Sequence, residues 1–223
     1  MNNRARLAAL VLALCAATLA RAQTSLDAAL DREMASLLAA YKALHAAPEL
    51  SHHEEKTAAF VAKELRALGY DVTERVGKYD RPELTGYGVV AVMRNGAGAT
   101  VLVRGDMDAL PVEEKTGLPY ASTVRAKNEA GQDVGVMHAC GHDIHVTSLV
   151  GTARLLAQLK DRWRGTLVLV GQPAEETIDG AKALLADNLY TRFPRPDFAV
   201  ALHDNADLEA GRVAVVPGYA LAS

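Results

Sequence analysis

The sequence is short of cysteine, has no excess of basic residues and contains only one long hydrophobic run. It holds 2 cysteines, and its 24 Lys and Arg residues are balanced by 27 Asp and Glu residues, for a formal net charge of -3. Nucleic-acid-binding surfaces need clustered positive charge, so this balance argues against DNA or RNA as a partner. Beyond this run, no apolar stretch reaches the roughly 20 residues that a membrane-spanning helix needs, which argues against stable insertion in a membrane.

The single hydrophobic run has the pattern of a secretory signal peptide. Arg4 and Arg6 precede apolar residues 7–19, and a small-x-small tripeptide follows at 20–22. The alternative is a buried or membrane-spanning helix, which fits less well because a span needs about 20 apolar residues. We therefore expect residues 1–22 to be removed and the mature protein to be periplasmic or secreted.

Cys140 is the only cysteine that would remain after this cleavage, because Cys15 lies within the signal peptide. A lone cysteine cannot form an internal disulfide, and an exported thiol is exposed to oxidation unless a group such as a metal occupies it. The remaining segment, residues 23–223, is long enough for one α/β domain.

Hydrophobic periodicity alternates along the chain between helical and strand patterns. Spacings of three and four predict helices at 26–44, 58–68, 144–159 and 181–189, the third with a face formed by Ile144, Ser148, Gly151, Leu155 and Leu159. Short apolar runs predict strands at 70–76, 89–93, 100–103, 166–170, 198–202 and 212–216, of which the second and third are expected to form a hairpin or adjacent pair. This alternation predicts a three-layer α/β sandwich with a largely parallel sheet. The polar stretch 112–135 has neither period and is expected to border a functional site.

Polar side chains of the kinds that bind metals follow the ends of several predicted strands. They lie in the segments 104–108, 172–176 and 203–204, and a fourth group lies at 137–145, where the long loop enters a helix. Open α/β sheets place their sites at such strand ends, so we expect the four segments to converge.

Cys140 and His142 are the first candidates for metal ligands, since both can turn inward from a loop that contains a glycine. A buried thiol and a capping or core histidine is the alternative for either residue alone. Glu175 and Glu176 diverge as neighbours, which suits a metal ligand, Glu176, beside a general base, Glu175. His203, directly after an apolar strand, is a further ligand candidate.

The other polar residues near these motifs are expected to support the ligands. Asp106 and Asp108 are favoured as residues that orient a ligating imidazole over residues that bind metal directly, and Asp143 is given the same supporting role. For His138 and His145, ligation and a supporting or structural role stay open, with His138 placed among the supporting residues. The remaining histidines are interpreted as ordinary helix-boundary or surface residues: His45, His52 and His53.

Four motifs stand out in these segments: Arg-Gly-Asp-Met-Asp-Ala-Leu-Pro (104–111), Met-His-Ala-Cys-Gly-His-Asp (137–143), Gln-Pro-Ala-Glu-Glu (172–176) and Ala-Leu-His (201–203). Together they resemble a known enzyme family, the amidohydrolase branch of the zinc-dependent aminoacylase and carboxypeptidase G peptidases, which includes hippurate hydrolases and indoleacetyl-amino-acid hydrolases. The resemblance covers the chain from about residue 37 to residue 223. Relatives with a histidine at the position of Asp106 fit less well.

The resemblance implies a metal-dependent amidohydrolase that cleaves the amide bond of N-acyl amino acids or small peptides. It implies a di-zinc exopeptidase-like catalytic domain with two divalent ions, zinc first and manganese, cobalt or nickel as alternatives. Cys140, His142, Glu176 and His203 match the family's ligand positions, and Glu175 matches its general base.

Members of the family continue into a dimerisation domain and a second catalytic segment with a further metal-binding histidine. We therefore expect residues 23–223 to be the N-terminal part of the catalytic domain, with a homodimer left open for the full-length form. A non-catalytic metal-binding remnant is the rival hypothesis. A protein with one structural or redox zinc at Cys140 would leave Glu175 and Glu176 unexplained.

Overall fold

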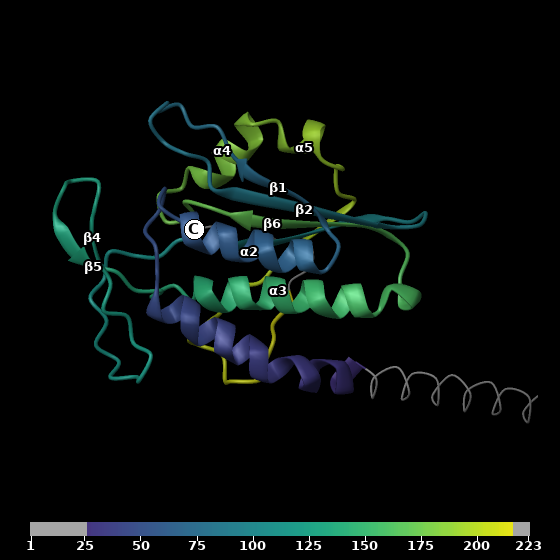
Figure 1. Cartoon of the computed structure of the whole chain (residues 1–223), viewed down its shortest axis with the longest axis horizontal. Coiled ribbons are helices and arrows are strands. Elements are labelled where there is room, and N and C mark those ends of the chain that lie inside the picture. The colour runs from purple at the N-terminus through teal and green to yellow at the C-terminus, as the bar shows by residue number, and fades with distance from the viewer. Residues whose placement is uncertain (1–25, 216–223) are drawn as a thin grey trace, which may run out of the picture.

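The chain folds into a five-stranded sheet between two layers of helices (Figure 1). The computed structural model describes residues 26–215, so the signal peptide expected at 1–22 and Cys15 lie outside the described residues. The main sheet contains β1 (Asp71–Val76), β2 (Gly88–Asn95), β3 (Thr100–Asp106), β6 (Gly165–Gln172) and β7 (Phe198–Ala201). The helices are 26–46, α2 (Glu55–Ala67), α3 (His142–Gln158), α4 (Gly180–Ala186) and α5 (Leu189–Arg192), with a short 3-10 turn at Lys160–Arg162.

The strand order β1-β2-β6-β3-β7 confirms a largely parallel sheet. β2 is antiparallel to both β1 and β6, while β6, β3 and β7 pair in parallel, so β2 alone runs against the other four strands. The expected pairing of β2 with β3 is wrong, because β6 lies between them and its Val168 pairs with Val92 on one side and Leu102 on the other. β6 is buried along nearly its whole length, and a central position satisfies its backbone on both sides.

Alternation along β2 shows why both faces of the sheet are covered. Val89, Ala91 and Met93 pack in the core on the side of α2 and α3, whereas Val90 and Val92 pack in the core on the side of α4 and α5. Successive side chains of a strand point to opposite faces, so an uninterrupted apolar run needs a helical layer on each face. The helices of Figure 1 provide these two layers, which confirms the three-layer sandwich.

The buried face of α3 differs from the predicted face. Ile144 is 39% exposed, while Val146, Leu149 and Val150 are at most 2% exposed. The inward positions of the first turn are occupied by two buried histidines, His142 and His145. The prediction counted only apolar residues as inward-facing. It therefore left out the two histidines and assigned the wrong face of the helix.

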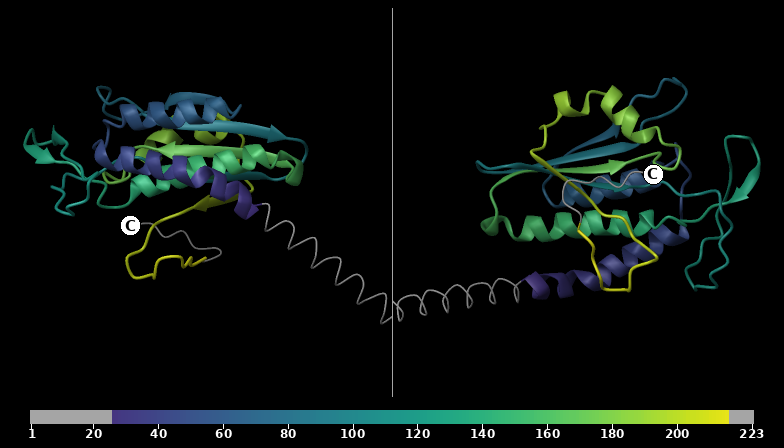
Figure 2. Two further views of the ribbon diagram at one scale, coloured as in Figure 1. Left: turned by 60° about the horizontal axis from the view of Figure 1, so that its bottom comes forward. Right: turned by 180° about the vertical axis from the view of Figure 1, so that it is seen from behind.

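Two other expected elements also differ. The predicted helix 181–189 is divided into α4 and α5 at Asn188, whose φ of 60° interrupts the helix. Residues 212–215 form no strand, and residue 216 lies outside the described residues. Figure 2 shows the segment after β7, in yellow, looping away from the sheet.

The long segment 112–135 is mostly irregular, and it carries a small ribbon of β4 (Arg125–Lys127) and β5 (Asp133–Gly135) that projects from one end of the molecule (Figure 1). Within residues 26–215, no helix combines the length and the hydropathy that crossing a bilayer requires.

Candidate metal centre

The carboxyl ends of β3, β6 and β7 bring the predicted site residues together. Asp106 ends β3, Glu175 and Glu176 follow β6, and His203 follows β7, while Cys140 lies in the turn before α3. Parallel neighbours end at the same sheet edge, which is where open α/β sheets form their sites. Donor atoms within 4.8 Å of one another form four overlapping groups: Cys140, His142 and His203; Asp106, His142 and His145; His145, His203 and Asp204; and His142, Glu175 and Glu176.

Gly141 lets the side chains of Cys140 and His142 approach the same point. Its φ of 75° lies in the left-handed region that glycine adopts without strain, and it forms the N-cap of α3. The Cys140 sulfur lies 3.6 Å from Nε2 of His203. The predicted inward turn of this loop is therefore present.

His142 is fully buried and presents one nitrogen to a group of carboxylates. Its Nδ1 donates a hydrogen bond to the backbone oxygen of Asp108 at 2.7 Å, so Nε2 carries the lone pair in the neutral ring. Nε2 has no hydrogen-bond partner among the described residues. One oxygen each of Asp106, Glu175 and Glu176 lies 3.8 Å from it, too far for a hydrogen bond.

Glu175 and Glu176 both point to this nitrogen, although they are adjacent in sequence. The backbone N–H of Glu176 donates to the side chain of Asp108 at 3.0 Å, which fixes the peptide between the two glutamates. Oε1 of Glu176 is buried without a hydrogen-bond partner among the described residues, whereas the Glu175 side chain is somewhat more exposed. Glu176 thus lies deeper in the cluster, and Glu175 lies closer to solvent.

Both ring nitrogens of His145 are engaged by protein groups. Nδ1 donates to Asp106 at 2.5 Å, and Nε2 accepts from the backbone N–H of Asp204 at 3.1 Å. Arg104 lies 3.0 Å from the second oxygen of Asp106. This bonding favours a structural role for His145, so the imidazole that Asp106 holds is not one of the predicted ligands.

The charges of the cluster favour a bound cation. Burial, followed by the neighbouring Glu176, raises the pKa of Cys140 to about 12. Burial alone would lower the pKa of His142, but its bond to Asp108 and the charge of Asp106 raise it to about 9. Such shifts show that the carboxylates attract positive charge, and a thiol, imidazoles and carboxylates are the donors that zinc and related divalent ions take. The residues present therefore fit a divalent metal.

Asp108, His138 and Asp143 differ in their relation to the cluster. Asp108 contacts both His142 and Glu176, as expected of a supporting residue. His138 is buried, neither of its nitrogens has a hydrogen-bond partner among the described residues, and burial lowers its pKa to about 4. The Asp143 carboxylate bonds to His45 and to the backbone of Ile144, neither of which is a predicted ligand.

His45 and His52 lie at helix boundaries as the sequence suggested, but both are buried, whereas His53 is exposed. His45 is buried between two carboxylates, with Nδ1 2.7 Å from Asp143 and Nε2 3.0 Å from Glu114. His52 lies 3.1 Å from Asp179. Their partners are remote in sequence, and no local pattern signals such pairs. Glu114 belongs to the segment 112–135, which thus connects to the start of α3 through His45 and Asp143.

Replacing His45 with asparagine is expected to destabilise the protein by about 1–3 kcal/mol at pH 6 and by less at pH 9. Burial lowers the pKa of His45, but hydrogen bonds to Glu114 and Asp143 outweigh it and raise the pKa. A raised folded-state pKa stabilises fully below the unfolded value of about 6.5, and this contribution is lost as pH rises through the folded value. Urea unfolding of wild type and variant at both pH values measures the difference, with the exposed His53→Asn variant as control. Equal losses at pH 6 and pH 9 would contradict a charged His45.

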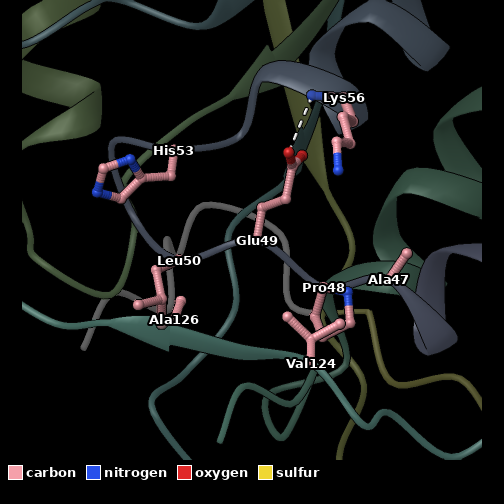
Figure 3. Close-up of a pocket in the computed structure, with 8 residues that line it drawn as sticks. All are labelled: Ala47, Pro48, Glu49, Leu50, His53, Lys56, Val124 and Ala126. Atoms are coloured by element: carbon pink, nitrogen blue, oxygen red, sulfur yellow. Dashed lines mark hydrogen bonds between the residues drawn. The ribbon is translucent and has the colours of Figure 1, made fainter. Parts of the chain in front are cut away.

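A hollow of about 300 Å³ lies beside the segment that precedes α2 (Figure 3). Pro48, Leu50, Val124 and Ala126 give it an apolar lining, and the Glu49 carboxylate in its wall accepts a hydrogen bond from the backbone N–H of Lys56. None of the residues that line it belongs to the cluster of donor atoms. The hollow is therefore separate from the candidate metal centre.

Comparison with known proteins gives a consistent set of similarities. Residues 102–218 match the model of peptidase family M20/M25/M40. The chain is 38% identical to the N-acetyl-L-cysteine deacetylase of Bacillus subtilis over 181 residues, which are 81% of this chain and 39% of that protein. It is 42% identical to the hippurate hydrolase of Campylobacter jejuni over 162 residues, which are 72% of this chain and 37% of that protein.

Among solved structures, the fold is similar to the YXEP protein of Bacillus subtilis, which is described as a dinuclear metal binding peptidase from the M20 family. The TM-score is 0.65 at 33% identity, with 82% of this chain and 45% of the other covered. The chain spans about two fifths of the length of the curated relatives above.

Proposed function

The chain belongs to peptidase family M20/M25/M40, and we propose that it supplies the metal site and general base of a hydrolase that cleaves amide bonds of N-acyl amino acids or small peptides. One observation carries this proposal. Nε2 of His142, buried and without a hydrogen-bond partner among the described residues, faces oxygens of Asp106, Glu175 and Glu176 at 3.8 Å, a spacing that leaves room for a cation between them.

Four residues would hold two divalent ions in this proposal: Cys140, His142, Glu176 and His203. Zinc is the first choice because the set combines a thiolate and imidazoles with a carboxylate, and manganese, cobalt and nickel are the alternatives. The similarity to the YXEP protein, described as a dinuclear metal binding peptidase, supports the number of ions. When bound, the ions would supply Lewis acidity that activates water and polarises the substrate carbonyl.

Glu175 would act as the general base. Its side chain is more exposed than that of Glu176, so it can reach a water molecule that enters from solvent. Its carboxylate would take a proton from that water and later deliver it to the leaving amine of the substrate. Asp108 would keep both partners in place, since it accepts the Nδ1 hydrogen of His142 and the backbone N–H of Glu176.

The substrate class rests on the relatives. Two of the most similar are named for N-acetylcysteine and for hippurate, which are both N-acyl amino acids, and a third is named a thermostable carboxypeptidase. We therefore place small N-acyl amino acids before longer peptides.

Metal content and hydrolysis, measured together, test the proposal. Elemental analysis of purified protein should give two divalent ions per chain, and a panel of N-acyl amino acids should include at least one that is hydrolysed and is spared after chelation. Metal binding without hydrolysis of any member would support the rival hypothesis of a non-catalytic metal-binding protein. Absence of bound metal after incubation with zinc would refute both hypotheses.

Export to the periplasm or the medium is a further part of the proposal, supported by the basic residues and apolar run of residues 1–22. N-terminal sequencing of exported protein should begin at residue 23. Recovery of only the uncleaved chain from the cytoplasm would contradict it.

A further inference from the structure

The segment 49–54, between the first helix and α2, contacts two loops that carry site residues. One follows β3 and the other follows β6. The Ser51 hydroxyl donates to Asp108 at 2.7 Å, and the backbone oxygen of Glu49 accepts from the N–H of Ala109 at 2.8 Å. On the other loop, the Glu54 carboxyl accepts from the backbone N–H of Ala174 at 2.7 Å. The segment therefore lies behind the candidate metal centre without contributing a donor atom to it.

The segment itself is held firmly. The Glu49 carboxylate accepts a hydrogen bond from the backbone N–H of Lys56 at 3.1 Å (Figure 3) and another from that of Thr57 at 2.8 Å, and so caps the first turn of α2. The next residue, Leu50, is buried and forms a parallel bridge with Ala109. Glu54 thus projects from a fixed backbone.

The contact between Glu54 and Ala174 falls at a strained point of the loop after β6. Ala174 has a φ of 48°, in the left-handed region that residues with a Cβ avoid, and its side chain is fully buried. The carboxyl group of Glu54 is also fully buried, and an N–H left unpaired at this depth would be unfavourable because it would lose its hydrogen bonds to water without gaining another partner. The hydrogen bond therefore offsets part of the cost of this backbone conformation.

The conformation of Ala174 decides where the following glutamates point. Ala174 directly precedes Glu175 and Glu176, whose oxygens both lie 3.8 Å from Nε2 of His142. Relaxation of Ala174 to a negative φ would turn the chain and carry both carboxylates away from that nitrogen. At the other end of the loop, the N–H of Gly180 bonds to the oxygen of Ala174 at 3.0 Å, so the turn is closed around this residue.

We propose that Glu54 is a positioning residue, whose buried carboxyl group holds the backbone N–H of Ala174 and thereby directs Glu175 and Glu176 toward the metal centre. This inference rests on the function proposed above. The role needs a hydrogen-bond acceptor and no negative charge, which agrees with a pKa that burial and the nearby Asp108 raise to about 8. Glutamine has an amide oxygen of the same reach and should preserve the hydrogen bond to Ala174. Methionine has a similar length but lacks this oxygen and should lose the bond.

The test compares Glu54→Gln and Glu54→Met, with Glu55→Gln as the control because Glu55 is the exposed neighbour paired with Arg75. The first readout needs no metal: hydrogen exchange of the Ala174 amide should be about tenfold faster or more in Glu54→Met and unchanged in the two glutamine variants. The second is Co²⁺ titration, in which Glu54→Met should bind at least about tenfold more weakly and show an altered visible spectrum, as expected for a lost supporting contact. Urea unfolding of each variant separates these effects from a general loss of stability.

Each outcome decides the inference. Glu54→Met with wild-type exchange at Ala174 and a wild-type Co²⁺ spectrum would overturn it, as would a Glu54→Gln variant as impaired as Glu54→Met. If Glu54→Met does not fold, Glu54→Asp takes its place, because its carboxylate ends one methylene short of Ala174 and should show the same losses. Wild-type protein that fails to bind Co²⁺ would refute the proposed function and this inference with it, whereas tight binding by both wild type and Glu54→Met would refute the role of Glu54 alone.

Discussion

Replacement of Glu175 with glutamine is expected to reduce amide hydrolysis by about two to four orders of magnitude while leaving the metal content unchanged. Glutamine has nearly the same shape as glutamate but cannot accept a proton from water at neutral pH. The Glu175 side chain is more exposed than that of Glu176, so its replacement should leave the deeper ligands in place. Steady-state kinetics on a hydrolysed N-acyl amino acid, together with elemental analysis, measure the two effects.

Glu176→Gln is the matched control for this experiment, because it makes the same chemical change one residue away. Oε1 of Glu176 is buried without a hydrogen-bond partner among the described residues, as expected of a ligand atom, so this variant should lose metal as well as activity. Full activity in Glu175→Gln would refute the assigned base. Equal metal loss in the two variants would mean that both glutamates are ligands.

Replacement of Cys140 with alanine is expected to weaken metal binding by more than the roughly 10- to 100-fold that loss of an outer-shell partner causes. The sulfur lies 3.6 Å from Nε2 of His203 and within 4.8 Å of the donor atoms of both His142 and His203, so its removal opens one side of the cluster. Zinc titration with a competing chelator measures the affinity.

Cys140→Asp and His53→Ala sharpen this test. Aspartate offers an oxygen donor at the same position and should recover part of the affinity that alanine loses, whereas His53 is exposed and its removal should have no effect. Affinity in Cys140→Ala equal to that of wild type would show that the thiol is not a ligand and would leave the cluster without its only sulfur donor, since Cys140 is the only cysteine of residues 23–223.

The secondary structure was largely predictable because period and composition are local properties. The apolar runs at 89–93 and 166–170 lie within β2 and β6, and the alternation of strands with helices predicted three layers. Strand order was not predictable in this way. β6 separates β2 from β3 although β2 and β3 are consecutive in sequence, because pairing depends on which strand can be buried on both sides.

The inward face of α3 illustrates the same limit within one helix. Its periodic apolar positions were visible, but His142 and His145 occupy inward positions that a hydrophobic pattern does not count. Burial of these rings depends on Asp108 and Asp106, which come from the end of β3. The face of the helix was therefore set by polar contacts between segments.

The sequence by itself determined which donor atoms are available, because the thiol, imidazole and carboxylate groups of Cys140, His142, Glu176 and His203 lie in short motifs at strand and helix ends. Only the tertiary structure decided which residues remote from one another in the chain pair around them. Asp143 bonds to His45 across 98 residues, Glu54 bonds to Ala174 across 120, and His52 bonds to Asp179 across 127. A hydrogen bond requires atoms to approach within about 3 Å, and for residues so far apart in the chain that approach is fixed by the packing of the whole sheet and its helices.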